Sequence, residues 1–340
     1  MNVEELDENK TNNLHCVICS RCIELLPGQQ IDSLSSPRFS QVTTFARLPN
    51  TRDLNRVKSI FIGIPFDDGT TFRTGTRFGP RAVREASRML RPYNPVVDVK
   101  PFQNLGMVDY GDVDVVPGYI EDTNRKIEDT LNPIFSSSII PAICGGDHSV
   151  TLPVLRAAAK KHGALSLIHF DAHSDCWDDY FGKKYNHGTT FKRALEEKLI
   201  DPARSIHVGL RGPLYESADL TDLTKMGYAV ITMKTFIEIG IPETLRQIWN
   251  VSKGKAYVSL DIDGVDPAFA PGTGTPEVGG FTSREIQELV RGLPGDRLVG
   301  FDVVEVSPPY DVAEITSLVA SNLIYELCSI VAKQNPILNK

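Results

Sequence analysis

The sequence contains no apolar run that approaches the roughly 20 residues needed to span a bilayer. Its N-terminus, MNVEELDENKTNN, is acidic and lacks the apolar core of a signal peptide. We therefore expect a cytoplasmic protein with no membrane partner. An excess of basic residues is also missing, since 36 Lys and Arg stand against 43 Asp and Glu. This balance argues against nucleic acid as a partner.

Cysteine is scarce and unevenly spaced, with six thiols in 340 residues, which suits reduced side chains better than a disulfide framework. Three of them, Cys16, Cys19 and Cys22, form a C-x2-C-x2-C run beside His15. Such a run could form a small metal or redox site, but no second cluster follows at the spacing of a zinc ribbon. We expect a poorly ordered extension over residues 1–45 and one folded domain over residues 46–340.

Short apolar runs alternate with amphipathic stretches from residue 58 onward. Strands are expected at 59–66, 104–111, 138–144, 165–171, 205–210, 228–233, 256–263 and 298–306. Helices are expected at 79–90, 151–163, 189–199, 282–293 and 314–333, the last as a core-packing helix. This alternation predicts a single-domain, three-layer α/β/α fold around a mainly parallel sheet of about eight strands.

Carboxylate and imidazole side chains gather at or just after the ends of four of the expected strands: Asp147, His148, Asp171, His173, Asp175, Asp261, Asp263, Asp266 and Glu305. One Asp after a strand is usually a turn or cap residue, and His148 alone is more often structural. Taken together, however, these side chains would meet at one rim, because the carboxyl ends of parallel strands lie along the same edge. Carboxylates crowded in this way are unfavourable unless cations offset their charge.

Two divalent cations would make the arrangement favourable. A mixture of carboxylate and imidazole ligands suits Mn²⁺ and could also accept Ni²⁺, Co²⁺ or Zn²⁺. The expected rim has no clustered thiols, which disfavours a structural zinc site. The sequence thus predicts a two-metal centre.

Three motifs in fixed order, GGDHS, DAHSDCWD and SLDIDGVDPAFAPGTGTPEVGG, resemble the signatures of the ureohydrolase (arginase/agmatinase) family. GIPFDDGTTFRTGTRFGPRAVREAS, NHGTTFKRA and DVVEVSPPYD resemble its agmatinase branch in particular. The resemblance covers roughly residues 45–335. It implies the family's fold and the hydrolysis of a small cationic guanidine to urea and an amine. It also implies two divalent ions per chain, with Mn²⁺ expected first and Ni²⁺ as the main alternative, and a homo-oligomer, either a trimer or a hexamer.

The resemblance also assigns roles to individual residues. Asp171 and Asp261 would bridge two metals, and His187 would carry a proton. Glu305 would pair with the substrate's guanidinium. The six implied metal ligands are His148, Asp171, His173, Asp175, Asp261 and Asp263. Three further motif positions, Asp178, Asp266 and Glu277, carry no ligand role.

The substrate is less well defined by the sequence. Cys176 and Trp177 stand where the agmatinase-like pattern usually has small or hydroxyl-bearing residues. An indole facing the metals would shorten the pocket and favour guanidine, guanidinopropionate, guanidinobutyrate or a biguanide, whereas an indole packed outward would leave a pocket for agmatine. Phe72 and Arg73 are expected in a loop that borders the pocket.

Two other function classes stay open. A non-catalytic subunit of a larger ureohydrolase assembly would be marked by lost ligands, yet all six positions are present. A metal-dependent deacetylase would use similar ligands without needing the paired D-x-H and D-x-D motifs.

Overall fold

The computed structural model describes residues 25–334. Its centre is one eight-stranded sheet in the order β2-β1-β3-β8-β7-β4-β5-β6, and every pairing is parallel. The strands are β1 (Ser59–Gly63), β2 (Val108–Asp112), β3 (Ile140–Cys144), β4 (Ser166–Phe170), β5 (Ile206–Val208), β6 (Ala229–Ile231), β7 (Ala256–Asp261) and β8 (Leu298–Val304). The central strands are almost entirely buried, as expected for parallel strands covered on both faces.

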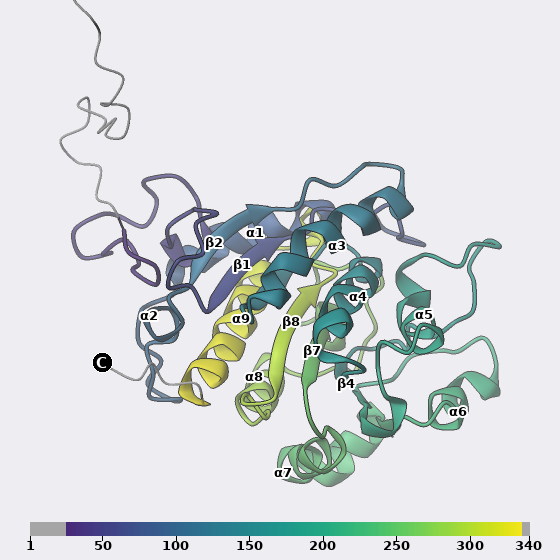
Figure 1. Cartoon of the computed structure of the whole chain (residues 1–340). Helices are drawn as coiled ribbons and strands as arrows, with labels where there is room; N and C mark the ends of the chain where they lie inside the picture. Colours follow the sequence, from purple (N-terminus) through teal and green to yellow (C-terminus); the bar gives the residue numbers. More distant parts are fainter. Residues whose placement is uncertain (1–24, 335–340) are drawn as a thin grey trace, which may run out of the picture.

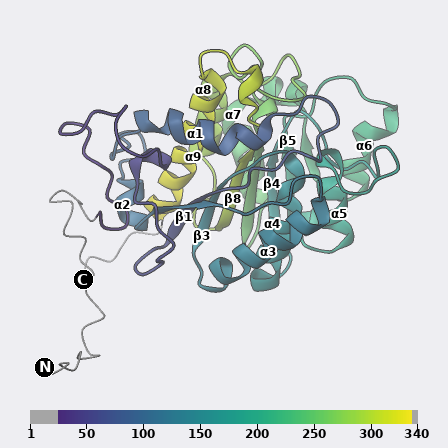
Figure 2. The same cartoon turned by 90° about the horizontal axis from the view of Figure 1, so that it is seen from above.

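Helices cover both faces of the sheet (Figure 1). They are α1 (Gly79–Ala86), α2 (Pro101–Leu105), α3 (Ile120–Ser136), α4 (Thr151–His162), α5 (Thr190–Glu196), α6 (Ser217–Lys225), α7 (Met233–Val251), α8 (Ser283–Arg291) and α9 (Ile315–Gln334). Figure 2 shows α3, α4 and α5 on one side and α1, α7, α8 and α9 on the other. Helix α9 packs against α1, α2 and α8, so it forms the middle of its layer.

The central strands supply both hydrophobic cores, because successive side chains point to opposite faces. In β1, Phe61 joins the core under α9, whereas Ile60 and Ile62 join the core under α3 and α4. Helix α9 is long and apolar enough to cross a membrane, but 78% of its most apolar stretch is buried inside the protein. It is therefore the core-packing helix that the sequence predicts.

The structure confirms the predicted α/β/α architecture and its parallel sheet. The first residues of two helices also agree with the sequence prediction. Pro80 lies in the first turn of α1, where its missing N–H costs nothing, and Thr282 caps α8 through a capping box with Glu285. The prediction omitted α2, α3, α6 and α7. Helix α3 contains Pro133, and α7 is kinked at Gly240 (φ 72°) just before Pro242, so proline interrupts both sequence patterns.

Parts of the described segment before the first strand pack on the body of the protein. Gly28 donates its N–H to the Met107 carbonyl (2.9 Å), and the Phe45 ring stacks on Phe61 with centroids 4.2 Å apart. Cys16, Cys19 and Cys22 lie outside the described residues. The proposed extension over residues 1–45 stays a prediction.

Candidate metal centre and its cavity

The four middle strands of the sheet, β3, β8, β7 and β4, end side by side. His148 follows β3 in a 3-10 turn (His148–Val150), and Asp171 follows β4 directly. Asp261 is the last residue of β7, with Asp263 in the 3-10 turn after it. Glu305 follows β8. The carboxyl edge of the sheet therefore collects the predicted side chains, as it does for ligands in open α/β sheets.

His148 and three carboxylates form the first, fully enclosed group. The Nδ1 atom of His148 lies 3.2 Å from Asp171 Oδ2, 2.9 Å from Asp175 Oδ2 and 3.2 Å from Asp261 Oδ2. All four side chains are buried, and Nδ1 of His148 has no hydrogen-bond partner among the described residues. A buried nitrogen that faces three carboxylate oxygens without bonding to any suits a shared cation. The donor set therefore fits a divalent metal ion.

His173 belongs to a second group that lies beside the first. Its Nδ1 is 3.0 Å from Asp263 Oδ2 and 3.5 Å from Asp171 Oδ1, so the two oxygens of Asp171 serve different groups. These three residues also form a potential metal-binding cluster. Its imidazole is 22% exposed, which places this group at the open side of the centre. The six predicted ligands thus converge as two adjoining sites.

Electrostatics shows why a carboxylate cluster of this density suits a cation. Burial and the charge of Asp171 raise the pKa of Asp175 to about 6. Burial and the charges of Asp263 and Asp171 raise the pKa of Asp261 well above its usual range. Burial would raise the pKa of Asp171 too, but its close contacts with His148, His169 and His173 hold the pKa of Asp171 far below normal. Bound cations would offset the same repulsion with every carboxylate ionised.

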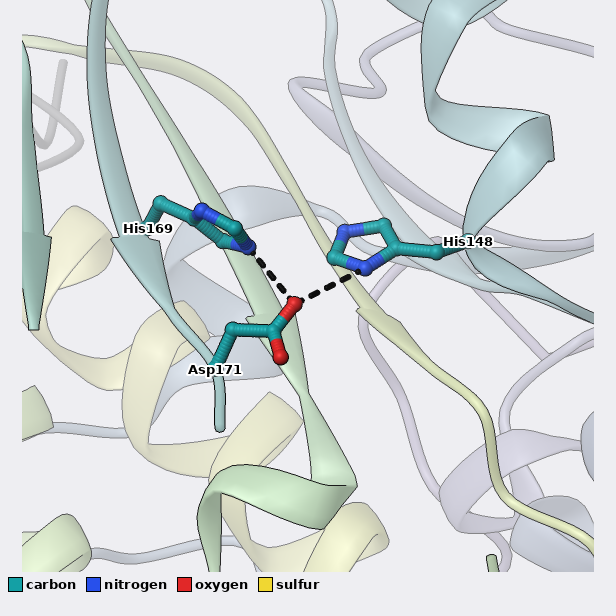
Figure 3. A group of neighbouring side chains, drawn as sticks. All are labelled: His148, His169 and Asp171. Carbon is teal, nitrogen blue, oxygen red and sulfur yellow. Dashed lines mark hydrogen bonds and ion pairs between the residues drawn. The ribbon is translucent and has the colours of Figure 1, made fainter. Parts of the chain in front are cut away.

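Hydrogen bonds from behind orient two of the ligands. His169, on β4, places Nε2 2.8 Å from Asp171 Oδ2, the oxygen that also faces His148 (Figure 3). Burial and nearby His207 lower the pKa of His169 to about 3, so this ring is neutral and can donate Nε2–H. Donors of this kind fix a ligand's orientation at a metal.

His148 is oriented through a serine. The Oγ atom of Ser259 lies 2.9 Å from His148 Nε2 and donates to Asp302 Oδ1 at 2.7 Å. Tyr257 and Thr151 donate to the other oxygen of Asp302, both at 2.8 Å. Turning Nε2 toward Ser259 leaves Nδ1 facing the carboxylates. The sequence prediction missed His169, Ser259 and Asp302 because they lie inside strands and read as core positions.

His187 bridges Glu305 and the loop after β1. Its Nδ1 is 2.9 Å from Glu305 Oε1, and its Nε2 accepts the Thr71 N–H (3.1 Å), with the Thr71 hydroxyl at 2.7 Å. In this arrangement Nδ1 carries the proton that faces Glu305. Burial alone would lower the pKa of His187, but Glu305 raises it to about 9, so the ring binds a second proton more readily than usual. A proton taken up at Nε2 would have to displace the hydrogen bond from the Thr71 N–H. Thr71 was not predicted, although it lies in the quoted GTTFRTGTRFGP stretch.

Glu305 is buried, and its two oxygens differ. Oε1 accepts the His148 N–H at 2.9 Å and contacts His187, whereas Oε2 has no partner among the described residues. A Cβ added to Gly274 would lie 3.7 Å from Oε2, so the missing side chain leaves room beside that oxygen. Oε2 thus has unused capacity to accept an N–H donor such as a guanidinium, although Glu305 is buried and is not among the residues that line the cavity described below.

Asp175 and Glu305 both adopt positive φ, 48° and 64°. This region is uncommon for residues other than glycine, and strain of this kind is often held at functional sites. This backbone conformation turns the side chains of both residues toward the cluster. No sequence pattern indicates it.

A cavity of about 490 Å³ opens onto the two groups. Its wall includes His173, Asp175, His187, Asp261, Asp263, Glu277, Thr71, Thr275 and the rings of Phe72, Trp177, Tyr180, Phe181 and Tyr215. Phe72 and Trp177 both lie in this wall, whereas the sequence left open whether the indole faces the pocket or packs outward. The Arg73 side chain instead lies over the Phe72 and Tyr310 rings, with its guanidinium carbon 5.3 and 4.9 Å from their centroids.

The three other motif acids lie around the centre without facing both groups. Asp178 is exposed and pairs with Arg193 at 2.6 Å. Asp266 accepts the N–H groups of Ala268 and Gly279. Glu277 Oε1 lies 3.9 Å from His173 Nε2, at the rim of the cavity.

Comparison with known proteins identifies close relatives. Residues 57–329 match the model of the Arginase family. The chain is 45% identical over 307 residues to guanidinopropionase of Pseudomonas aeruginosa, covering 90% of this chain and 96% of that protein. It is 43% identical over 307 residues to guanidinobutyrase of the same organism, covering 89% and 96%. The structure of proclavaminate amidino hydrolase from Streptomyces clavuligerus matches with a TM-score of 0.83 at 40% identity, over 88% of this chain and 100% of that chain.

Proposed function

The chain belongs to the arginase family, and we propose that it is a binuclear metal hydrolase of the agmatinase-like branch, releasing urea and an amine from a linear guanidine. The observation that carries this proposal is the pair of adjoining ligand groups at the edge of the cavity, joined by the two oxygens of Asp171. All six implied ligands are present and converge, which favours an active enzyme over a non-catalytic subunit. The paired D-x-H and D-x-D motifs favour a ureohydrolase over a deacetylase.

We propose that His148, Asp171, Asp175 and Asp261 hold one ion and that Asp171, His173, Asp261 and Asp263 hold the other. Mn²⁺ is expected first and Ni²⁺ second, because carboxylate and imidazole donors suit both. When bound, a metal pair supplies a nucleophile at neutral pH by lowering the pKa of water. The remaining tasks belong to the chain's own residues.

Glu305 and His187 are proposed to perform those tasks. The free Oε2 of Glu305 would accept a guanidinium N–H and fix the orientation of the substrate's central carbon. His187 would receive a proton on Nε2, which its contact with Glu305 favours, and deliver it to the departing amine. The amine needs this proton, because an unprotonated amide-like nitrogen is a poor leaving group.

The wall of the cavity favours some guanidines over others. Its charged members are acids and histidines, and no Lys or Arg is among the described residues that form it. A substrate carboxylate would meet Glu277 and aromatic faces, whereas a cationic or uncharged tail would contact the rings favourably. Although relatives are named for guanidino acids, we propose agmatine or a compact uncharged-tail guanidine as the substrate of this chain.

A urea assay tests the proposal across agmatine, methylguanidine, guanidine, 4-guanidinobutyrate and 3-guanidinopropionate. We expect activity after loading with Mn²⁺ or Ni²⁺ and loss of activity after chelation. The guanidino acids should have kcat/KM about 10-fold lower or worse, the size of effect that one mismatched contact produces. Release of no urea from any guanidine with either metal would reject the function, whereas a preference for a guanidino acid would reject only the substrate assignment.

Trp177 is expected to set the length of the accepted tail. The backbone N–H of Trp177 donates to the Gly188 carbonyl (3.1 Å). Its indole lies 3.4 Å from the position that a Cβ on Gly188 would occupy, and Gly188 follows His187 in the chain. Replacing Trp177 by Ser should raise kcat/KM for agmatine relative to methylguanidine by about 10-fold, because it opens space next to the reacting centre. The two proteins must be compared at equal metal content, because the substitution could also weaken metal binding by Asp175. An unchanged ratio would show that the indole does not limit the tail.

We also propose that the protein is located in the cytoplasm and that it assembles into a homo-oligomer, either a trimer or a hexamer. Both proposals follow from the sequence and the family resemblance. Exposed rings at the cavity rim, Phe181 and Tyr215, are 83% and 73% accessible in the single chain. Subunit contacts near this rim would change how much of the cavity is open to solvent.

A further inference from the structure

Three arginines outside the metal centre converge beneath the loop formed by residues 31–43. Arg47 ends a short 3-10 turn (Phe45–Arg47), Arg88 lies in another (Ser87–Met89), and Arg38 belongs to the loop itself. Arg47 and Arg88 are buried, at 4% and 7% exposure. Arginine is rarely buried unless it is paired.

Several N–H groups of these arginines have no acceptor. Arg47 donates through Nη2 to the Ser36 carbonyl (3.0 Å), but its Nε and Nη1 are buried and have no hydrogen-bond partner within residues 25–334. The Nε atoms of Arg38 and Arg88 are also buried, and no hydrogen-bond partner lies near them in the described part of the chain. Each buried donor left unpaired costs free energy, and donors on a charged group cost the most.

The local acids do not balance this charge. Glu85 lies 3.4 Å from Arg88 Nε and also accepts from Thr43. Asp32 is exposed and accepts the Leu34 N–H. Among the described residues, neither Arg38 nor Arg47 has a carboxylate within ion-pair distance, in contrast to buried Arg84, which pairs with Asp109 at 2.8 Å.

Water could satisfy the unpaired N–H groups of Arg47, but it would leave the positive charge unbalanced. Burial and the charges of Arg38 and Arg88 lower the pKa of Arg47, with Asp32 opposing them. Guanidinium groups with free N–H donors match oxyanions well, because their planar fork meets two oxygens at once. An anion at this position would supply both the acceptors and the negative charge that the described residues lack.

The same arginines fasten the loop to the body of the protein. Arg88 donates to the carbonyls of Arg38 (2.7 Å) and Gln41 (2.9 Å) and to the Thr43 hydroxyl (2.8 Å). Arg38 donates to the Ser33 hydroxyl (3.2 Å), and the Ser36 and Ser40 hydroxyls are 3.2 Å apart. An anion at the guanidinium groups would have serine hydroxyl donors nearby. It would add hydrogen bonds between the loop and the body of the protein and so stabilise the loop.

We propose that Arg38, Arg47 and Arg88 bind a small tetrahedral oxyanion, of the sulfate or phosphate class, beneath the loop of residues 31–43. A small free anion fits better than a partner's carboxylate, because the unpaired N–H atoms are already buried within the single chain. The site lies outside the metal centre, and the inference does not depend on the proposed reaction.

The test uses sulfate on the full-length, metal-loaded protein at constant ionic strength, with chloride as the replaced anion. The unfolding temperature should rise by about 2 °C or more at about 20 mM sulfate, because a ligand that binds only the folded state stabilises it. Tryptic cleavage after Arg38 should slow in parallel, since the anion fastens that loop. Arg47→Met should abolish both effects, and Arg47→Lys should reduce them. The matched control, exposed Arg52→Met, should keep both.

Three results would overturn the proposal. An equal sulfate effect in Arg47→Met would place the binding elsewhere, for example at the metals. No sulfate effect in the wild type would mean that no free oxyanion binds. A sulfate effect that emerges only after removal of residues 1–24 would identify that acidic stretch of the chain as the occupant. If Arg47→Met does not fold, Arg47→Lys and the trypsin measurement on the wild type decide the question.

Discussion

Replacing Asp171 by Asn should remove most of the bound metal and lower kcat/KM for urea release by about 10³-fold or more, because metal ions supply several kcal/mol of transition-state stabilisation. One oxygen of Asp171 faces His148 and the other faces His173, so this carboxylate belongs to both ligand groups. Asparagine keeps one oxygen and loses the charge. Asp261→Asn should behave similarly, since Asp261 is the other proposed bridge. Elemental analysis and a urea assay on the same preparation measure both effects.

Asp178→Asn is the matched control for the bridging variants. Asp178 belongs to the same DAHSDCWD motif but is exposed and pairs with Arg193. It should therefore keep full metal content and nearly full activity. Two metals per chain in Asp171→Asn would contradict the bridging role, whereas loss of metal in Asp178→Asn would show that the motif as a whole, rather than the bridge, holds the ions.

The strands and the strand-end residues could be predicted because two local signals coincide in them. Short apolar runs mark buried parallel strands, and the polar residues directly after each run must lie at one edge of the sheet. The order of the strands in the sheet could not be predicted from these signals. Strands β3 and β4 follow each other in the chain, but β8 and β7 lie between them in the sheet. Their separation by two late strands is what brings His148 and Asp171 to adjoining positions around Asp261.

The residues that orient the centre could not be found in the same way. His169, Ser259 and Asp302 occupy strand interiors, where the sequence pattern indicates only burial. Their role depends on the pairing of neighbouring strands, which places Ser259 opposite both His169 and Asp302. The left-handed backbone conformation of Asp175 and Glu305 could not be predicted either, because neither residue type requires it.

The two unusual charge clusters of this chain are related by the same physical argument. At the metal centre, buried carboxylates face an imidazole nitrogen that none of them bonds, which favours a cation. Beneath the loop of residues 31–43, buried guanidinium groups keep unpaired donors, which favours an anion. The first cluster was predictable from motifs, whereas the second combines residues 38, 47 and 88 that share no motif.

His187→Ala should lower kcat by about 10²–10⁴-fold, the usual range for losing a positioned proton donor or acceptor, while both metals stay bound. His187 contacts Glu305 and Thr71, and its side chain bonds to none of the six proposed ligands. Removing it therefore takes away the proton carrier and leaves the two ligand groups intact. His162→Ala, at the end of α4, is the control and should be close to wild type.

A second substitution separates proton transfer from mere positioning of Glu305. His187→Asn can still donate a hydrogen bond toward Glu305, yet it cannot carry a proton to the amine at neutral pH. If proton transfer is the role of His187, the Asn variant should be as slow as the Ala variant. If His187 only holds Glu305 in place, the Asn variant should recover most of the activity and KM should change more than kcat. Loss of metal in proportion to activity in either variant would instead make His187 a ligand, and the division of roles between it and the six carboxylate and imidazole donors would fail.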